Sequence, residues 1–198
     1  MRFHFLDAVI LDLMGAPSGM SEQALNESSD PVRALAHALD KIRALVRAAD
    51  DEQYVRSGMI GFASPLGAHV RHCIDHVDAL LHGLQEGQVR EIRYDRRERG
   101  TRIEVDRSEA LNVCTDRRDQ VLGIDGGCLE GPVRVLAMVS PRGPELCFES
   151  TALRELLYVF HHTVHHIALM AAHAEHLGVP LERDLGRAPA TLAADQDT

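Results

Sequence analysis

The sequence predicts a mainly helical, all-α fold: a four-helix bundle with a small β-hairpin inserted before the last helix. Apolar residues recur at spacings of three and four in separate stretches along the chain, which is the pattern of amphipathic helices. Pro or Ser residues stand at expected helix starts, and a Gly follows the last helix. A strand-like segment with a Pro-Arg-Gly-Pro turn precedes that helix. Four amphipathic helices of similar length bury their apolar faces best against one another, so a bundle is expected.

The first helix is expected to begin at Pro31, with Ser29 or Asp30 as its N-cap. Its apolar residues predict an amphipathic helix of about 20 residues. These residues are Val32, Leu35, Leu39, Ile42, Leu45, Val46 and Ala49. Residues 1–28 are expected to form an irregular lead-in. The apolar start of this lead-in carries two aspartates and lacks a cleavage signature, so it does not resemble a signal peptide.

The second helix is expected to begin at Pro65, after a Ser64 cap, and to run to about Glu86. Beside its apolar stripe, three histidines spaced by three and four lie together on a neighbouring face. They are His69, His72 and His76. Asp75 on the same helix is a candidate to orient His72 or His76. Cys73 belongs to the apolar stripe, so we expect a buried, inert thiol there.

Residues 90–107, between the second and third helices, contain seven arginines and five acidic residues. The interleaved charges favour an extended, partly ordered surface crossover over a nucleic-acid-binding patch. A smaller alternative is that Arg97 or Arg102 reaches back to hold an anionic substrate. Ser108 is expected to cap the third helix, which runs from about Glu109 to Leu122.

The hairpin insertion is expected over about residues 132–149, with its turn at residues 141–144. Ser150 then opens the last helix, which ends at Leu177 before a Gly and a nearby Pro. The core side of this helix is expected to carry Leu153, Leu156, Leu157, Phe160, Val164, Ile167 and Ala171. Residues 181–198 are rich in Ala and Asp and are expected to form a frayed tail.

Composition excludes several classes of protein. The formal net charge is −9, which opposes nonspecific binding to nucleic acid because that binding depends on phosphate neutralisation. No apolar run approaches the roughly 20 residues of a membrane span, so no membrane association is expected. The four cysteines form no CxxC pair, so we expect reduced thiols in a cytoplasmic protein.

Four of the twelve histidines lie within six residues of the last helix, and this density is the strongest functional feature of the sequence. His161/His165 and His162/His166 are both spaced by four, so each pair lies on one helix face. Imidazole is costly to bury without a partner, and two histidines at this spacing form a bidentate clamp for a transition metal. A third histidine from the second helix would complete a site with open coordination positions, as in catalytic metal centres.

Two motifs resemble those of the DinB/YfiT-like superfamily of metal-dependent four-helix-bundle proteins. They are Ser64-Pro-Leu-Gly-Ala-His69-Val-Arg-His72 and His162-Thr-Val-His165-His166. Members of that superfamily carry one ligand histidine on the second helix, after a Ser/Thr start, and an HxxxH pair on the last helix. Related ergothioneine-pathway domains place the second-helix ligand eight residues after the Ser, which corresponds to His72.

The resemblance covers about residues 30–178 and implies a domain over residues 29–180. It implies that His72, His162 and His166 hold a divalent metal, with His76 or His69 as alternatives to His72. Two features depart from the family pattern. An apolar run, Ile167-Ala-Leu-Met170, replaces the usual polar continuation after the histidine pair, and the hairpin is not part of the minimal bundle.

The resemblance also implies a function, namely activation of water or a low-molecular-weight thiol for attack on a small-molecule substrate. The reaction would be hydrolysis or thiol S-transfer. Three imidazoles suit Zn, Ni, Fe or Mn, and the sequence does not choose among them. His76 and His165 are the candidates for acid–base catalysis or for supporting a ligand, whereas His173 and His176 are expected at the surface.

Two alternatives to an enzyme remain. The same histidines can hold a metal in a non-catalytic binding module. A metal-free bundle can also act as an interaction protein, forming a homodimer through an apolar helix face.

Overall fold

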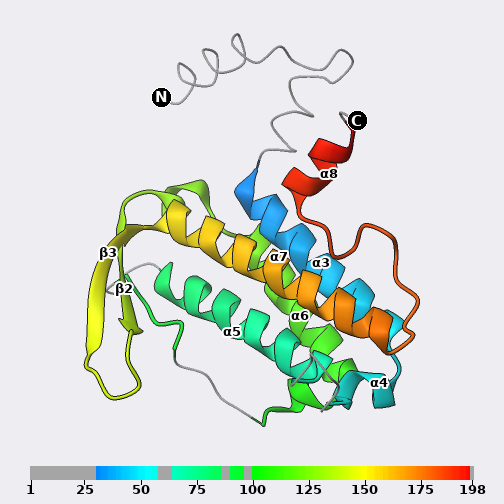
Figure 1. The fold of residues 1–198 in the computed structure, drawn as a ribbon. Coiled ribbons are helices and arrows are strands. Elements are labelled where there is room, and N and C mark those ends of the chain that lie inside the picture. Colours follow the sequence, from blue (N-terminus) through cyan, green and yellow to red (C-terminus); the bar gives the residue numbers. More distant parts are fainter. Residues whose placement is uncertain (1–29, 58–63, 86–89, 96–99, 197–198) are drawn as a thin grey trace. The chain divides into compact units, whose positions relative to one another are not determined.

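The computed structural model describes residues 30–57, 64–85, 90–95 and 100–196. The chain divides into two units, Met1–Asp30 and Pro31–Thr198. The predicted lead-in at residues 1–28 lies outside the described residues. The second unit is mainly helical with a three-stranded sheet, which confirms the predicted fold class at this level (Figure 1).

The four predicted helices are present with bounds close to those expected. They are α3 (Pro31–Ala48), α5 (Leu66–Gly83), α6 (Arg107–Leu122) and α7 (Ala152–His176). The sequence did not predict the short helix α4 (Asp51–Val55) or the 3₁₀ turns η1 (Arg102–Glu104) and η2 (Gly126–Leu129). Helix α6 begins two residues earlier than expected, because Asp106 and not Ser108 caps it by accepting from the backbone N–H of Glu109.

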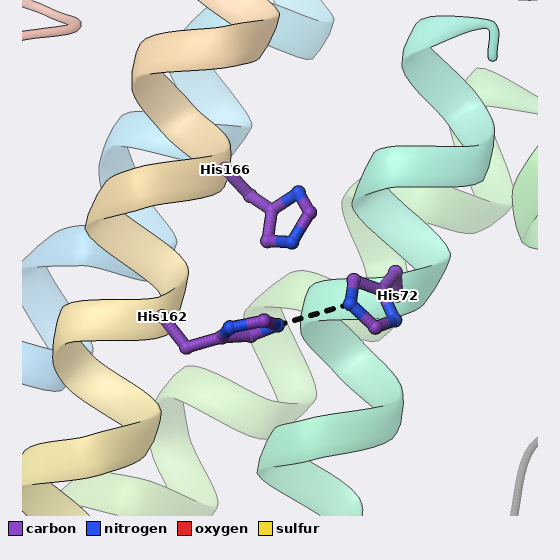
Figure 2. A group of neighbouring side chains, drawn as sticks. All are labelled: His72, His162 and His166. Atoms are coloured by element: carbon purple, nitrogen blue, oxygen red, sulfur yellow. Dashed lines mark hydrogen bonds between the residues drawn. The ribbon is translucent and has the colours of Figure 1, made fainter. Parts of the chain in front are cut away.

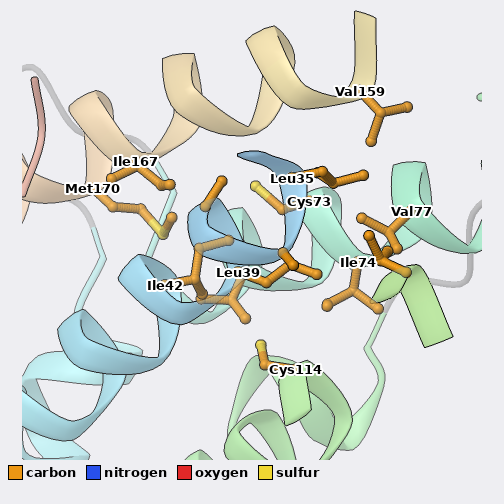
Figure 3. Close-up of a cluster of buried hydrophobic side chains, with 14 of the residues drawn as sticks. Leu35, Leu39, Ile42, Cys73, Ile74, Val77, Cys114, Val159, Ile167 and Met170 are labelled. Atoms are coloured by element: carbon orange, nitrogen blue, oxygen red, sulfur yellow. The ribbon is translucent and has the colours of Figure 1, made fainter. Parts of the chain in front are cut away.

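The four long helices share one apolar core. Helix α3 packs against α6 and α7, and α5 packs against the same two helices. Figure 3 shows side chains from all four meeting between them. The residues labelled there are Leu35, Leu39, Ile42, Cys73, Ile74, Val77, Cys114, Val159, Ile167 and Met170. Cys73 is fully buried, as predicted, and burial raises the pKa of its thiol.

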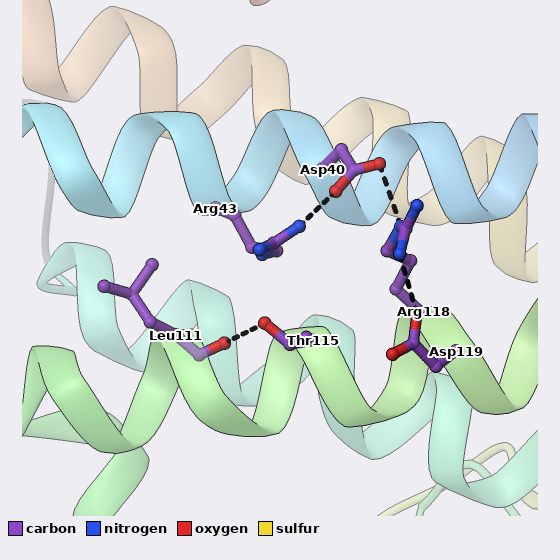
Figure 4. Close-up of polar contacts among 6 residues, drawn as sticks. All are labelled: Asp40, Arg43, Leu111, Thr115, Arg118 and Asp119. Atoms are coloured by element: carbon purple, nitrogen blue, oxygen red, sulfur yellow. Dashed lines mark hydrogen bonds and ion pairs between the residues drawn. The ribbon is translucent and has the colours of Figure 1, made fainter.

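Helix α6 contributes few apolar side chains to this core and contacts α3 partly through charged groups (Figure 4). Arg118 Nε donates to Asp40 at 3.1 Å, and Arg43 of α3 binds the same carboxylate at 2.5 Å. These side chains are partly exposed, and ion pairs of this kind contribute about 0–1 kcal/mol each. The buried residues of α6 therefore provide most of the attachment; they are Ala110, Cys114 and Val121.

The sheet contains the predicted hairpin and one strand that was not predicted. Strands β2 (Pro132–Met138) and β3 (Glu145–Thr151) are antiparallel, and β1 (Glu91–Ile92) pairs parallel with β2. Strand β1 belongs to the Arg-rich segment that the charge pattern placed on the surface as a partly ordered crossover. Ile92 is fully buried, and the added Cβ of an alanine at Gly83 would lie 2.4 Å from its side chain, so β1 is packed tightly onto α5.

Helix α7 is rotated relative to the core side expected from sequence. Leu153 and Leu157 are 50% and 46% exposed, so their prediction as core residues is wrong. The surface prediction for His173 is also wrong, because its side chain is fully buried. The chain after α7 folds back over the end of that helix, with Gly186 against Ala171, and this contact helps to bury the last turns.

The region from residue 181, predicted as a frayed tail, includes the buried Leu185 and the helix α8 (Pro189–Gln196). Gly186 packs closely enough against α7 that a Cβ there would approach the Cβ of Ala171 to 2.7 Å. The composition of this segment did not reveal that Leu181 and Leu185 pack on the core and that Gly186 packs on α7.

Candidate metal centre

Three histidines converge where α5 and α7 lie side by side. His72 projects from α5, and His162 and His166 project from successive turns of α7 into the space between the helices (Figure 2). One ligand nitrogen from each ring can be chosen so that all three lie within 4.8 Å of one another. Within the described residues, this is the one group of His, Cys, Asp and Glu side chains that meets this distance criterion. The structure thus brings together the three residues predicted as metal ligands.

The spacing of these nitrogens fits a transition-metal ion. His162 Nε2 lies 3.0 Å from His72 Nε2. Two nitrogens bound tetrahedrally to one ion at about 2.0–2.1 Å are roughly 3.3 Å apart. This pair is therefore near ligand spacing, and a nitrogen of His166 lies within 4.8 Å of both other ligand nitrogens. Three imidazoles without a fourth protein ligand form the donor set of an open site.

The electrostatics of the cluster favour neutral rings. Burial, reinforced by the nearby His76, lowers the pKa of His162 to about 4. Burial and the neighbouring His162 lower the pKa of His166 to about 3. Both rings are therefore neutral at pH 7, with a lone pair ready to bind a cation, because metal ions bind the unprotonated imidazole.

His69 contacts one of the predicted ligands. Its Nδ1 lies 3.1 Å from Nδ1 of His166, so a proton shared between these two atoms leaves Nε2 of His166 for a metal. Such a contact fixes the tautomer and the orientation of a ligand ring. This arrangement suits His69 to support His166, and it places His69 outside the three-nitrogen group in which it was an alternative.

His76 lies beside the triad and is only 5% exposed. Its Nδ1–H donates to the backbone carbonyl of His72 at 3.0 Å, which assigns the proton to Nδ1 and the lone pair to Nε2. The His76 ring stacks on Tyr94, with centroids 5.1 Å apart and an interplanar angle of 13°, and on His162, at 4.1 Å and 25°. These contacts hold the His76 ring in one orientation next to two of the three candidate ligands.

A cavity of about 260 Å³ opens next to the histidines. Its walls are formed by His72, His76, Tyr94, Asp95, Val135, Ala137, Arg154, Glu155 and Tyr158. Helices α5 and α7, the sheet and the segment after β1 all contribute to it. A small molecule in this cavity would therefore contact both His72 and His76.

Glu155 organises one wall of this cavity. Its side chain is fully buried, and it accepts hydrogen bonds from the Tyr94 hydroxyl at 2.9 Å, the Ser150 hydroxyl at 2.6 Å and Arg154 NH1 at 2.6 Å. A carboxylate without solvent requires such donors, since burying it unpaired would be very costly. Burial and the adjacent Glu155 raise the pKa of Tyr94, so Tyr94 remains a protonated donor.

Sequence reasoning missed Tyr94, Arg154, Glu155 and Tyr158 as lining residues. Tyr94 lies in the charged segment before the third helix, where no periodicity marked it. Tyr158 and Glu155 precede His162 by four and seven residues, so both share a side of α7 with it. The position of Glu155, seven residues before His162 and next to the buried Leu156, was the one sequence signal that could have placed it beside the histidines.

Several other candidates lie elsewhere. His161 and His165 are exposed, and neither lines the cavity, although the His165 ring lies 5.4 Å from that of His166. The Asp75 carboxylate accepts from Arg71 at 2.5 Å. Arg102 binds Asp106 at 2.8 Å and does not line the cavity, while Arg97 lies outside the described residues.

Comparison with protein-family models, with curated proteins and with solved structures finds no match to this chain. Within the described ranges, no helix is both long enough and apolar enough to cross a membrane.

Proposed function

We propose that this chain is a metal-dependent enzyme of the DinB/YfiT type. In this proposal α3, α5, α6 and α7 form the four-helix bundle of that superfamily, and the hairpin is an insertion in it. His72, His162 and His166 hold one divalent transition metal. The reaction is hydrolysis or thiol S-transfer on a small molecule bound in the adjacent cavity.

One observation carries the proposal: three imidazole nitrogens from two helices converge within 4.8 Å at the edge of a cavity of about 260 Å³. A purely structural metal site is closed by four protein ligands, whereas catalytic sites keep a position for water or substrate. His72 belongs both to the triad and to the cavity wall, so a ligand in the cavity can reach the metal position.

The bound ion would act as a Lewis acid that lowers the pKa of a coordinated water or thiol. The chain's own residues supply the rest. His76 Nε2 carries the lone pair of a fixed, buried ring on the cavity wall, which suits it to accept a proton from the nucleophile. His165 is exposed and outside the cavity, so the arrangement favours His76 over His165 as the acid–base residue. Zn, Ni, Fe and Mn all suit three imidazoles.

Metal analysis of untagged protein tests the site. We expect about one equivalent of a transition metal in the wild type and a loss of most of it in His162→Ala/His166→Ala. The matched control is His161→Ala/His165→Ala, which removes the other pair with the same spacing from the same helix. Equal metal loss in both double variants, or a wild type that never takes up metal, would contradict the assignment.

Activity assays then distinguish an enzyme from a binding module. Esterase and thiol-transfer substrates should be turned over only without chelator, and added metal should restore the rate. For His76→Gln we expect kcat to fall about 100-fold or more with metal content unchanged, since a positioned acid–base group contributes typically 10²–10⁴-fold. Stoichiometric metal without turnover of either substrate class would favour the non-catalytic module instead.

A further inference from the structure

Arg154 is the one arginine or lysine among the described residues that line the cavity. It lies in the first turn of α7, eight residues before His162, which is about 12 Å along the helix axis. Its side chain is 63% exposed, so it stands at the mouth of the cavity while the histidines stand deeper in the molecule.

The guanidinium is held in place by its surroundings. NH1 donates to Glu155 Oε1 at 2.6 Å, and the group lies over the ring of Tyr158 at 5.4 Å. An arginine has five N–H donors in a rigid fork, so the contact with Glu155 leaves donors for a ligand. A guanidinium already fixed by a carboxylate and an aromatic face loses little conformational entropy on binding an anion.

The two carboxylates of the cavity offset part of the positive charge of Arg154, so an anion would bind through the remaining N–H donors of the guanidinium together with the other positive groups nearby. Glu155 is fully buried and its oxygens accept from three side chains. Asp95 accepts from the backbone N–H of Met138 at 2.7 Å. A divalent ion on three neutral imidazoles would add further positive charge, and the first turn of α7 contributes the positive end of its helix dipole.

The cavity can enclose a small ligand. Its volume is about 260 Å³. Val135 and Ala137 contribute apolar side chains to its wall. A ligand of this size can carry a metal-binding group at one end, a short aliphatic body and a charged group at the other end.

We propose that Arg154 is an anion subsite that binds the carboxylate of a small organic acid, whose opposite end faces the three histidines. The inference rests on the proposed function, because it assigns the second group of the substrate of that same site. It narrows the substrate class from small molecules in general to short carboxylic acids that carry a thiol or an ester.

The test uses two thiols of matched length, mercaptohexanoate and mercaptohexanol, with the Co²⁺-loaded full-length protein. Thiolate-to-cobalt absorption reports binding of the sulfur, and calorimetry gives Kd. We expect mercaptohexanoate to bind more tightly than mercaptohexanol. Arg154→Gln should raise the Kd of mercaptohexanoate about tenfold, which corresponds to the loss of one hydrogen bond to a charged group. The Kd of mercaptohexanol should not change. The Kd of mercaptohexanoate for Arg154→Lys should lie between those of the wild type and Arg154→Gln, because lysine keeps the positive charge but lacks the paired N–H donors of the guanidinium.

Arg183→Gln is the matched control, since this exposed arginine does not line the cavity. Equal Kd values for the two thiols, or an equal loss for both in Arg154→Gln, would overturn the subsite while leaving the metal site intact. Failure of the wild type to take up Co²⁺ would instead refute the proposed function. Calorimetry with hexanoate on metal-free protein still decides the subsite in that case: weaker binding by Arg154→Gln supports it, and unchanged binding overturns it.

Discussion

Removal of the His162 ring should abolish most of the stabilisation that a bound metal gives to this chain. His162 is the informative position because its Nε2 lies 3.0 Å from Nε2 of His72, the closest pair in the candidate centre. The exposed His161 precedes it on the same helix, so His161→Ala changes the same residue type with almost no change in position. The comparison therefore separates loss of a ligand from loss of a histidine.

The expected magnitude follows from linkage. At a free metal concentration 100 times Kd, binding stabilises the folded state by about 2.7 kcal/mol. If loss of one of the three ligands raises Kd about 100-fold, metal binding at the same free metal concentration stabilises the folded state by only about 0.4 kcal/mol. For a chain of this size, about 2–4 °C of Tm correspond to 1 kcal/mol. The metal-induced rise in Tm should therefore fall from roughly 5–11 °C in the wild type to roughly 1–2 °C in His162→Ala.

Thermal unfolding with and without Zn²⁺ measures this difference within each variant. The within-variant comparison is needed because the His162 ring stacks on His76 at 4.1 Å, so its truncation also changes the stability of the metal-free protein. His161→Ala should keep the full wild-type rise. The same rise in His162→Ala as in the wild type would refute the ligand assignment, and so would an equal reduction in His161→Ala.

Three further predictions concern the metal-free protein. In the folded protein the pKa values of His162 and His166 are about 4 and about 3, below the ordinary 6.5. At pH values between the folded and the ordinary pKa, the unfolded chain therefore binds more protons than the folded one. Stability in urea should therefore decrease as the pH is lowered from 7 to 5, and replacing both rings by Gln should reduce this dependence. Gly67→Ala places a Cβ 2.1 Å from a backbone carbonyl of η1 and should cost about 1–3 kcal/mol in urea unfolding, whereas Gly126→Ala, with open space around it, should cost much less. Tyr54→Phe removes a 2.8 Å hydrogen bond from a buried hydroxyl to a carbonyl of η1 and should lower the unfolding free energy by about 1–2 kcal/mol.

The long helices could be predicted because burial on one face imposes a period near 3.6 on the sequence. The same reasoning could not find β1, since two residues, Glu91 and Ile92, are too short for any alternation to show. It also misjudged Leu153 and Leu157. Their spacing fits a helical stripe, but only the tertiary arrangement determines whether an apolar residue at the edge of a stripe is covered.

Residue type and spacing predicted histidine clusters on two helices, because both are local properties of the sequence. They left two pairs open on the last helix, and the resemblance to the superfamily selected His72, His162 and His166. The cavity could not be predicted, because its walls come from segments distant in sequence. Tyr94 reaches the site only because β1 pairs with β2, and Arg154 only because the hairpin ends where α7 begins. These two residues place the histidine cluster beside a cavity with polar and charged walls.

The choice between two overlapping histidine pairs depends on which face of α7 meets α5. Glu155, His162, His166 and His173 are spaced by seven, four and seven residues, so they lie within about 40° of one another around the helix. The two ends of this polar stripe, Glu155 and His173, are fully buried, while the two middle histidines are only partly covered. His161 and His165 lie outside the stripe and are exposed. A metal that must bind both protein and substrate needs rings that are held by packing at the edge of a cavity. The middle of the stripe provides two partly covered rings, and His72, which faces them from α5, lines the cavity.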